Sequence, residues 1–234
     1  MQNRYAGDIG DYVKLALLRA LAPGFRLGVA WYLYPDEGHN SDGRHVAYLN
    51  DPERWRSLDP ELFDGLRRMV SRERSVSSIE RARVLDATFS REVMNHGAAP
   101  PALRSQMREA WFARACDSLR NCDLVFADPD NGLTDDAPSR RSSRTFGKQL
   151  PVAEALALAA GRPAVIYHHN SRFKGGHDAE VEHWRFKLGE GTVAIRATAF
   201  SCRTFFIVGG SDDLLARADA FSRRWSGAKV RLHR

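Results

Sequence analysis

A short apolar run that ends abruptly in polar residues constrains the fold of this chain more than any other stretch. Residues 124–127 carry no charge, as is typical of a strand buried on both faces of a parallel sheet. The run is followed at once by Asp128-Pro129-Asp130-Asn131-Gly132, in which the proline ends the strand and Asn-Gly favours a turn. Asp128, Asp130 and Asn131 are therefore expected at the carboxyl edge of a sheet, where open α/β sheets bind ligands. The alternative is a solvated turn whose carboxylates only cap backbone N–H groups.

Two other apolar runs end in the same way. Residues 27–34 precede a polar loop that contains Asp36, Glu37 and His39, and residues 163–167 precede His168-His169-Asn170-Ser171. The carboxyl ends of parallel strands meet at one edge of a sheet. We therefore expect these polar groups to gather around a shared site.

The remaining pattern predicts an α/β fold: a doubly wound, mostly parallel sheet with helices on both faces and an antiparallel C-terminal strand pair. Apolar residues recur at helical spacing in residues 11–21, 51–72, 103–120, 152–160, 175–187 and 213–225. Further strands are expected in residues 75–85, with Asp86 at their end, and in 192–199, 203–208 and 229–232. The strands 192–199 and 203–208 have a short link between them, which makes them antiparallel neighbours.

Without repeats or a linker, residues 1–234 are expected to form a single domain. Residues 134–146 bear arginines and are expected to form a mobile loop.

Composition narrows the possible partners and the compartment. The net charge of +6 favours a polyanion such as RNA or DNA. Three cysteines without a Cys-x-x-Cys pair exclude a disulfide framework and a zinc ribbon. There is no leader-like segment and no run of about 18 apolar residues, so we expect a cytoplasmic protein with no membrane partner.

Three short pieces resemble parts of Rossmann-like S-adenosylmethionine-dependent methyltransferases. Residues 5–14, Tyr-Ala-Gly-Asp-Ile-Gly-Asp-Tyr-Val-Lys, resemble the Ala-Gly-Asn-x-x-Asp-x-x-Lys start of the RlmJ-type 23S ribosomal RNA adenine-N6 methyltransferases. Asp128-Pro129 resembles the Asp-Pro-Pro-Tyr motif of N6-adenine methyltransferases, and residues 82–89 resemble a strand whose Asp faces the cofactor's adenine. The segment Gly-Asp-Ile-Gly-Asp also resembles the start of a bacterial protein family without an assigned activity.

The resemblance implies a Rossmann-like fold, S-adenosylmethionine as cofactor and methyl transfer to adenine or another exocyclic amine of nucleic acid. It implies Lys14 near the cofactor's carboxylate and Asp86 near its adenine, and we add Asp8, Asp36, Glu37 and His39 as residues around the cofactor. Asp128, Asp130, Asn131 and His168 are the candidate catalytic residues.

The chain departs from the family in two places. Pro35-Asp36-Glu37-Gly38-His39 stands where the family has a glycine-rich loop, and Asp130 and Asn131 stand where it has a proline and the aromatic residue that stacks on a flipped base. Phe146 and Tyr167 are the candidates for that stacking role.

Two other functions remain open at this point. The first is a metal-dependent nuclease or phosphodiester hydrolase, with Mg²⁺ or Mn²⁺ held by the carboxylates and histidines of the strand ends. Its candidate residues are Asp36, Glu37, His39, Asp128, Asp130, His168 and His169. The second is a nucleic-acid-binding protein without catalytic activity, which explains the positive charge but not three polar strand ends.

Overall fold

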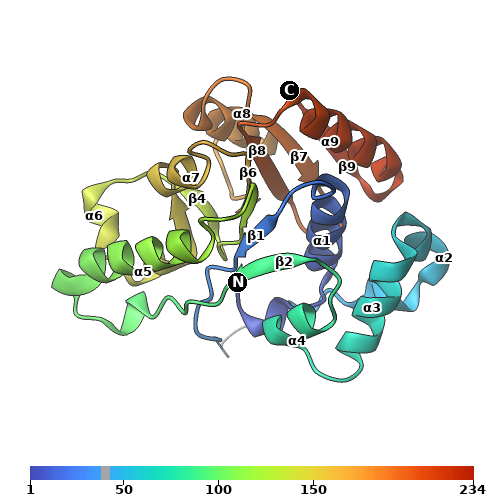
Figure 1. Cartoon of the computed structure of the whole chain (residues 1–234), viewed down its shortest axis with the longest axis horizontal. Coiled ribbons are helices and arrows are strands. Elements are labelled where there is room, and N and C mark those ends of the chain that lie inside the picture. Colours follow the sequence, from blue (N-terminus) through green and yellow to red (C-terminus); the bar gives the residue numbers. More distant parts are fainter. Residues whose placement is uncertain (38–42) are drawn as a thin grey trace.

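The protein is described by a computed structural model that covers residues 1–37 and 43–234. Figure 1 shows a central twisted sheet with helices packed on both faces. The sheet has seven strands in the order β2-β1-β3-β6-β8-β7-β9. Its strands are β1 Leu27–Ala30, β2 Ala87–Ser90, β3 Leu124–Ala127, β6 Ala164–His169, β7 Val193–Ala197, β8 Arg203–Val208 and β9 Val230–His233, and β4 Gly132–Thr134 pairs separately with β5 Gln149–Pro151.

The pairing confirms the predicted fold class. Strands β2, β1, β3 and β6 are parallel neighbours, while β8 runs antiparallel to both β6 and β7, and β9 runs antiparallel to β7. Every residue of β1, β3 and β8 is buried, as the uncharged sequences of β1 and β3 require when helices cover both faces, and in β8 the buried residues include Arg203 and Thr204. The fold is therefore α/β and Rossmann-like, with antiparallel strands at the C-terminal side.

Helices divide between the two faces of the sheet. The helices are α1 Ile9–Leu21, α2 Pro52–Trp55, α3 Pro60–Val70, α4 Val76–Arg81, α5 Arg104–Ser118, α6 Pro138–Arg141, α7 Val152–Leu158, α8 Gly176–Leu188 and α9 Asp212–Arg224. Buried side chains of α1, α3, α4 and α9 form one apolar core, and those of α5, α7 and α8 form the other (Figure 1). We call these two faces the α1 face and the α5 face.

Strand alternation assigns side chains to these faces. Phe126 of β3 and Val165 of β6 belong to the α1-face core, whereas Val125 and Ile166 belong to the α5-face core. Successive strand residues point to opposite faces. The same alternation continues into the residues that follow each strand. It therefore decides which polar side chains at the strand ends point toward α1.

The helix α1 begins where the sequence provides a cap. The Asp8 side chain accepts a hydrogen bond from Asp11 N, and the helix then buries Leu15, Leu18 and Leu21 against the sheet. Because α1 lies beside the carboxyl ends of β3 and β6, its first two turns carry Asp11 and Lys14 to the edge of the sheet.

Two expectations about local structure were wrong. Residues 76–81 are helical rather than extended, because Ser75 caps the segment and Val76 and Ile79 bury at helical spacing. The strand β2 starts after Asp86, so this residue lies at the amino end of the strand instead of its carboxyl end. A third expectation holds only in part: the run 27–34 pairs continuously as far as Ala30, Tyr32 has a positive φ of 46°, and Leu33 then forms a single bridge with Val93.

Residues 134–146 contain the short helix α6 and are held to the rest of the chain by buried side chains. Arg104 donates to Ser142 O, Arg108 donates to Phe146 O over 2.7 Å, and His96 Nε2 lies 3.1 Å from Arg141 O. These bonds give the segment a defined position beside α5, in contrast to the expected loop.

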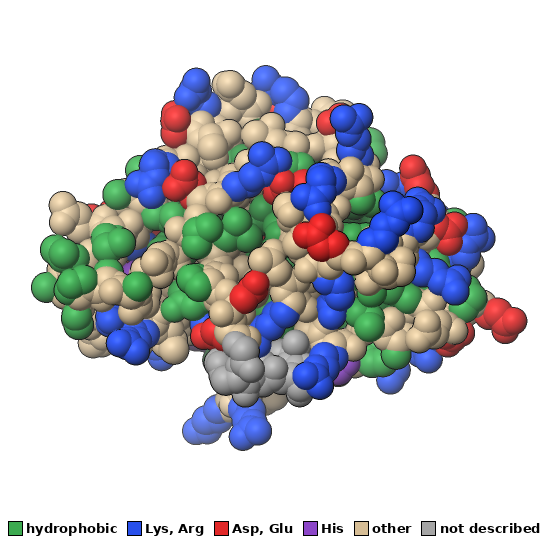
Figure 2. Space-filling view, turned by 90° about the horizontal axis from the view of Figure 1, so that it is seen from below, with side chains coloured by type: hydrophobic (Ala, Val, Ile, Leu, Met, Phe, Trp, Pro, Cys, Tyr) green, Lys and Arg blue, Asp and Glu red, His purple; other side chains and the backbone are tan. Residues whose placement is uncertain are grey.

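The surface carries charges of both signs. Figure 2 shows Lys and Arg side chains distributed over one face, with Asp and Glu between them. Within the described residues, no helix is long and apolar enough to cross a membrane.

Candidate functional site at the carboxyl edge of the sheet

A pocket of about 320 Å³ opens at the carboxyl ends of β3 and β6, beside the first turns of α1. We call it the α1 pocket. Its acidic lining residues are Asp8, Asp11, Asp128 and Asp130, its basic ones are Lys14 and Arg203, and Asn131, Tyr167, His169 and Ser201 also line it. The volume lies within the range of small-molecule sites. Of the three polar strand ends expected at one site, those of β3 and β6 supply most of the polar lining, and the loop after β1 supplies Gly43 and His45.

The floor of the pocket is an ion-paired group of three buried side chains. Lys14 Nζ lies 2.6 Å from Asp11 Oδ1 and 2.7 Å from Asp128 Oδ2. All three side chains are at most 4 % exposed. Asp11 also accepts a hydrogen bond from Gly7 N over 2.8 Å, so its second oxygen is held by the backbone.

Burial and charge act in opposite directions on these groups. Burial raises the pKa of Asp128, and the adjacent Lys14 ammonium opposes that shift. Burial alone lowers the pKa of Lys14, but the charges of Asp11 and Asp128 outweigh it, so that this pKa is raised. Lys14 is therefore a permanent cation whose charge is already compensated by two carboxylates.

Asp130 anchors the N-terminal segment at the side of the pocket. Its Oδ1 lies 2.7 Å from the Met1 α-amino group, and its Oδ2 accepts a hydrogen bond from Gln2 Nε2. The same amino group donates to Tyr32 O and Asp128 O over 3.0 and 3.1 Å. Burial raises the pKa of Asp130, and the amino group and Gln2 more than offset it, so the pKa is lowered.

Two of the residues expected around a cofactor do not line the α1 pocket. Asp36 accepts bonds from Asn3 N and Asn3 Nδ2 over 2.8 and 2.9 Å, and Glu37 pairs with Lys148. Both carboxylates thus hold neighbouring chain segments together. His39 lies outside the described residues.

Asp86 is also remote from the pocket. It is exposed and precedes β2, so it lies at the opposite edge of the sheet from the carboxyl ends of β3 and β6. Asp86 therefore does not line the α1 pocket, because the strand begins one residue after it rather than ending one residue before it.

His168 points to the α5 face, away from the α1 pocket. Its Nδ1 accepts a hydrogen bond from Leu133 N over 2.9 Å, which places the proton of the neutral ring on Nε2. Nε2 in turn lies 3.0 Å from Glu180 Oε1. The same ring leaves no space for a side chain at Gly132, since a Cβ there would lie 2.4 Å from His168 Nδ1. His168 is therefore a structural link between β4, β6 and α8, not a member of the site.

Arg203 is a pocket residue that sequence reasoning did not identify. It opens β8 on the α1 face, is 2 % exposed, and has Nε and Nη1 without a hydrogen-bond partner among the described residues. Asp11 was also missed as the second carboxylate on Lys14. The only sequence signal for Arg203 was a charged residue at the start of an otherwise apolar strand.

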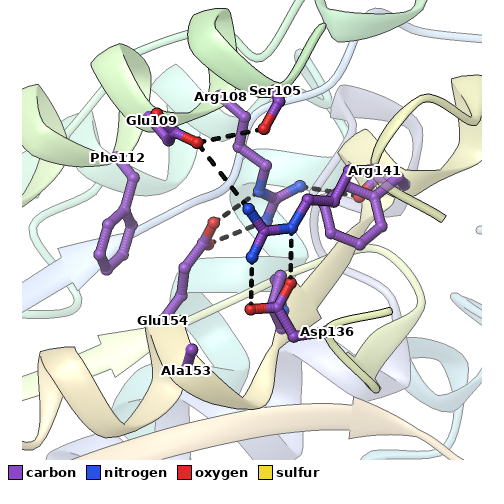
Figure 3. A pocket seen from close by; sticks show the side chains of 10 residues that line it. Ser105, Arg108, Glu109, Phe112, Asp136, Arg141, Ala153 and Glu154 are labelled. Atoms are coloured by element: carbon purple, nitrogen blue, oxygen red, sulfur yellow. Dashed lines mark hydrogen bonds and ion pairs between the residues drawn. The ribbon is translucent and has the colours of Figure 1, made fainter. Parts of the chain in front are cut away.

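A second cavity, of about 330 Å³, lies between α5 and residues 136–154 and is shown in Figure 3. Its charged side chains point toward one another: Arg108 lies 2.6 Å from Glu154, and Arg141 lies 2.9 Å from Asp136. Because these charged groups already pair with one another, the cavity has fewer unpaired charged groups to bind a ligand than the α1 pocket has. Phe146, expected as a possible stacking residue, is buried here.

The candidate metal ligands among the described residues do not form a metal-binding group. Within residues 1–37 and 43–234, no group of three or more His, Cys, Asp or Glu side chains is placed to hold a metal ion. His168 is on the opposite face of the sheet, and Asp36 and Glu37 are bound to the N-terminal segment.

Comparisons with protein-family models, with curated proteins and with solved structures find no match for this chain. The site is therefore interpreted from its own geometry.

Proposed function

We propose that the protein is a methyltransferase-like enzyme that uses S-adenosylmethionine and acts on an exocyclic amine of nucleic acid, with adenine as the expected base. The observation that carries the proposal is the position of Asp128. Asp128 directly follows β3 at the carboxyl edge of a Rossmann-like sheet. Its side chain lines the α1 pocket, and Lys14 Nζ lies 2.7 Å from its Oδ2.

Asp128 suits an amine substrate because of how its carboxylate is held. Lys14 binds Oδ2, and within the described part of the chain it is the one side-chain donor to this group. Oδ1 is then able to accept an N–H from an exocyclic amine, which would orient the nitrogen lone pair. Methyl transfer depends mainly on such positioning, since no strong acid or base is needed.

The pocket also fits the chemistry of the cofactor. When bound, S-adenosylmethionine supplies an electrophilic methyl group on a positively charged sulfur. Asp8 and Asp128 line the pocket and complement a cation, while Arg203 complements a carboxylate. Burial and the neighbouring Asp11 raise the pKa of Asp8, and a cation bound beside it would stabilise its charged form.

Tyr167 is the residue that we assign to base stacking. Its partly buried ring lines the α1 pocket, and Lys14 Nζ lies 5.8 Å from the ring centroid. An aromatic face beside Asp128 would replace the aromatic residue missing from the Asp-Pro-Asp-Asn sequence. The net charge of +6 supports a polyanionic substrate.

The test is transfer of a radiolabelled methyl group from S-adenosylmethionine to RNA and to DNA. Asp128→Asn keeps the shape of the side chain but replaces one acceptor oxygen, and we expect it to lower the rate by about a hundredfold or more. Asp86→Asn is the matched control, since Asp86 is exposed and remote from the pocket, and it should retain full activity. Equal activity of Asp128→Asn and the wild type would refute the assigned role.

A further inference from the structure

Arg203 is a buried cation whose hydrogen-bonding capacity is largely unused. Its Nη2 donates to Ser201 Oγ, but Nε and Nη1 have no partner among the described residues. An arginine with two unpaired buried donors is unfavourable, because the guanidinium has lost its hydration without replacement. Such a group at the wall of a pocket indicates a binding role for an oxyanion.

Lys14, the family-based candidate for this role, is already engaged. Its ammonium is bound by both Asp11 and Asp128 in the floor of the pocket. A third carboxylate on Lys14 would add negative charge to a site that already has two acids for one cation. Arg203, in contrast, has two N–H groups, Nε and Nη1, without a hydrogen-bond partner among the described residues.

The neighbourhood of Arg203 adds a complementary acid. A Cβ on Gly10 would lie 3.2 Å from Arg203 Cζ and 2.9 Å from Asp8 Oδ1, so the guanidinium and the carboxylate both lie against this glycine. Among the described residues, the hydrogen bond that the Asp8 side chain accepts comes from Asp11 N, at 3.0 Å. The absence of a side chain on Gly10 lets Asp8 and Arg203 come this close to each other, and both groups line the α1 pocket, from which a ligand would reach them.

We propose that Arg203 and Asp8 form a subsite for an α-amino-acid group, in which Arg203 binds the carboxylate and Asp8 binds the ammonium. An amino acid carries an ammonium and a carboxylate on the same carbon atom, which matches an anion and a cation that both lie against one glycine. The subsite rests on the proposed function, because the methionyl end of S-adenosylmethionine is the amino acid that it would bind. Arg203 then takes the position that the resemblance assigned to Lys14.

The experiment compares two nucleosides that differ in the amino-acid group. S-Adenosylhomocysteine carries it, and 5′-methylthioadenosine lacks it. We expect Arg203→Met to weaken S-adenosylhomocysteine about tenfold to a hundredfold in isothermal titration calorimetry, and to leave 5′-methylthioadenosine within about twofold. Asp8→Asn, which preserves a good helix cap, should show the same selectivity.

The stability of the free protein provides a second readout. Replacing an unpaired buried cation with an apolar side chain of similar length should leave the melting temperature unchanged or raise it. Arg196→Met is the matched control: Arg196 is also a buried strand arginine, but it points to the α5 face and pairs with Asp178 over 2.6 Å. We expect that variant to leave the affinities for both nucleosides unchanged. Arg203→Lys tests the subsite with the charge retained, should the methionine variant fail to fold.

The possible failures are distinguishable. If the wild type binds S-adenosylhomocysteine and the Arg203 and Asp8 variants bind it equally well, the subsite is refuted and the proposed function stands. If the wild type does not bind S-adenosylhomocysteine, both are refuted. If Arg203→Met weakens adenosine 5′-monophosphate but not S-adenosylhomocysteine, Arg203 recognises a phosphate and the amino-acid subsite is again refuted.

Discussion

At the scale of single residues, Lys14 determines the electrostatics of the α1 pocket. Two buried carboxylates, Asp11 and Asp128, lie within 2.7 Å of its ammonium, so each acid depends on the same cation. A group of this kind is sensitive to the loss of one member, because the remaining charges stay buried without compensation. Lys14 therefore holds Asp128 Oδ2 in place, and its charge opposes the rise in the pKa of Asp128 that burial causes.

Lys14→Met is expected to lower the free energy of unfolding by about 3–5 kcal/mol, because Asp11 and Asp128 would then repel each other in a buried site. Urea denaturation followed by circular dichroism measures the change. Adding Asp128→Asn to Lys14→Met should recover part of the loss, since one of the two uncompensated charges is removed. A double variant less stable than Lys14→Met alone would contradict this account.

At the scale of elements, the link between β6 and α8 is a polar network on the face opposite the α1 pocket. Glu180 of α8 accepts hydrogen bonds from His168 Nε2, Asn170 Nδ2 and Ser171 N, each at 3.0 Å, and from Ser171 Oγ at 2.6 Å. The carboxylate replaces its lost hydration with four protein donors. This network fixes the carboxyl end of β6, from which Tyr167 and His169 reach the pocket on the other face.

The pKa of Glu180 makes this link sensitive to acid. Burial raises the pKa, but the bonds from His168, Ser171 and Asn170 outweigh it and lower the pKa from 4.5 to about 2. A carboxyl group with a lowered pKa in the folded state stabilises the fold fully above its unfolded pKa, and this contribution is lost as the pH falls from about 4.5 to about 2. Thermal melts of the wild type should therefore show a loss of stability in that interval.

Glu180→Gln should be less stable than the wild type at neutral pH, and the difference in melting temperature should shrink as the pH falls below about 4.5. Glu182→Gln on the same helix is the control, because the Glu182 side chain is exposed and its ion pair with Arg185 contributes little. A pH-independent difference between wild type and Glu180→Gln would show that the charge of this group does not matter.

At the scale of the whole molecule, the positive charge is distributed rather than confined to the pocket. Figure 2 shows Lys and Arg spread over the face that it draws, with acids between them, and the net charge is +6. Distributed basic residues bind a polyanion through its phosphates and provide little sequence selectivity. Selectivity in the proposed reaction would then come from the α1 pocket.

Binding of RNA or DNA to the protein is expected to weaken by about tenfold or more between 50 and 200 mM salt, because bound counterions are released from the phosphates. Fluorescence anisotropy with a labelled oligonucleotide measures this. Binding of S-adenosylhomocysteine in the same buffers should change much less, which separates the surface contribution from that of the pocket. Salt-independent binding of nucleic acid would contradict a phosphate-based interaction.

The amino-acid sequence by itself determined the sheet, the edge at which the pocket lies, and Asp128 as a residue of that edge. Uncharged runs such as residues 124–127 bury on both faces, and a following Asp-Pro-Asp-Asn-Gly ends the strand, so both properties are encoded locally. The antiparallel C-terminal strands were predictable for the same reason, from two apolar runs and the short link between them.

Only the tertiary structure decided which side chains meet. Lys14 and Asp128 are far apart in the sequence, and their contact follows from the packing of α1 against the sheet. His168 and Asp86 were misplaced because two strands have other bounds than expected. The strand β6 extends to His169, so alternation turns His168 to the α5 face, whereas residues 76–81 are helical and β2 begins only after Asp86. Arg203 belongs to the site because β8 pairs antiparallel with β6 and brings its first residue beside His169. Such long-range pairing depends on the packing of the whole sheet, and no local pattern in the sequence specifies it.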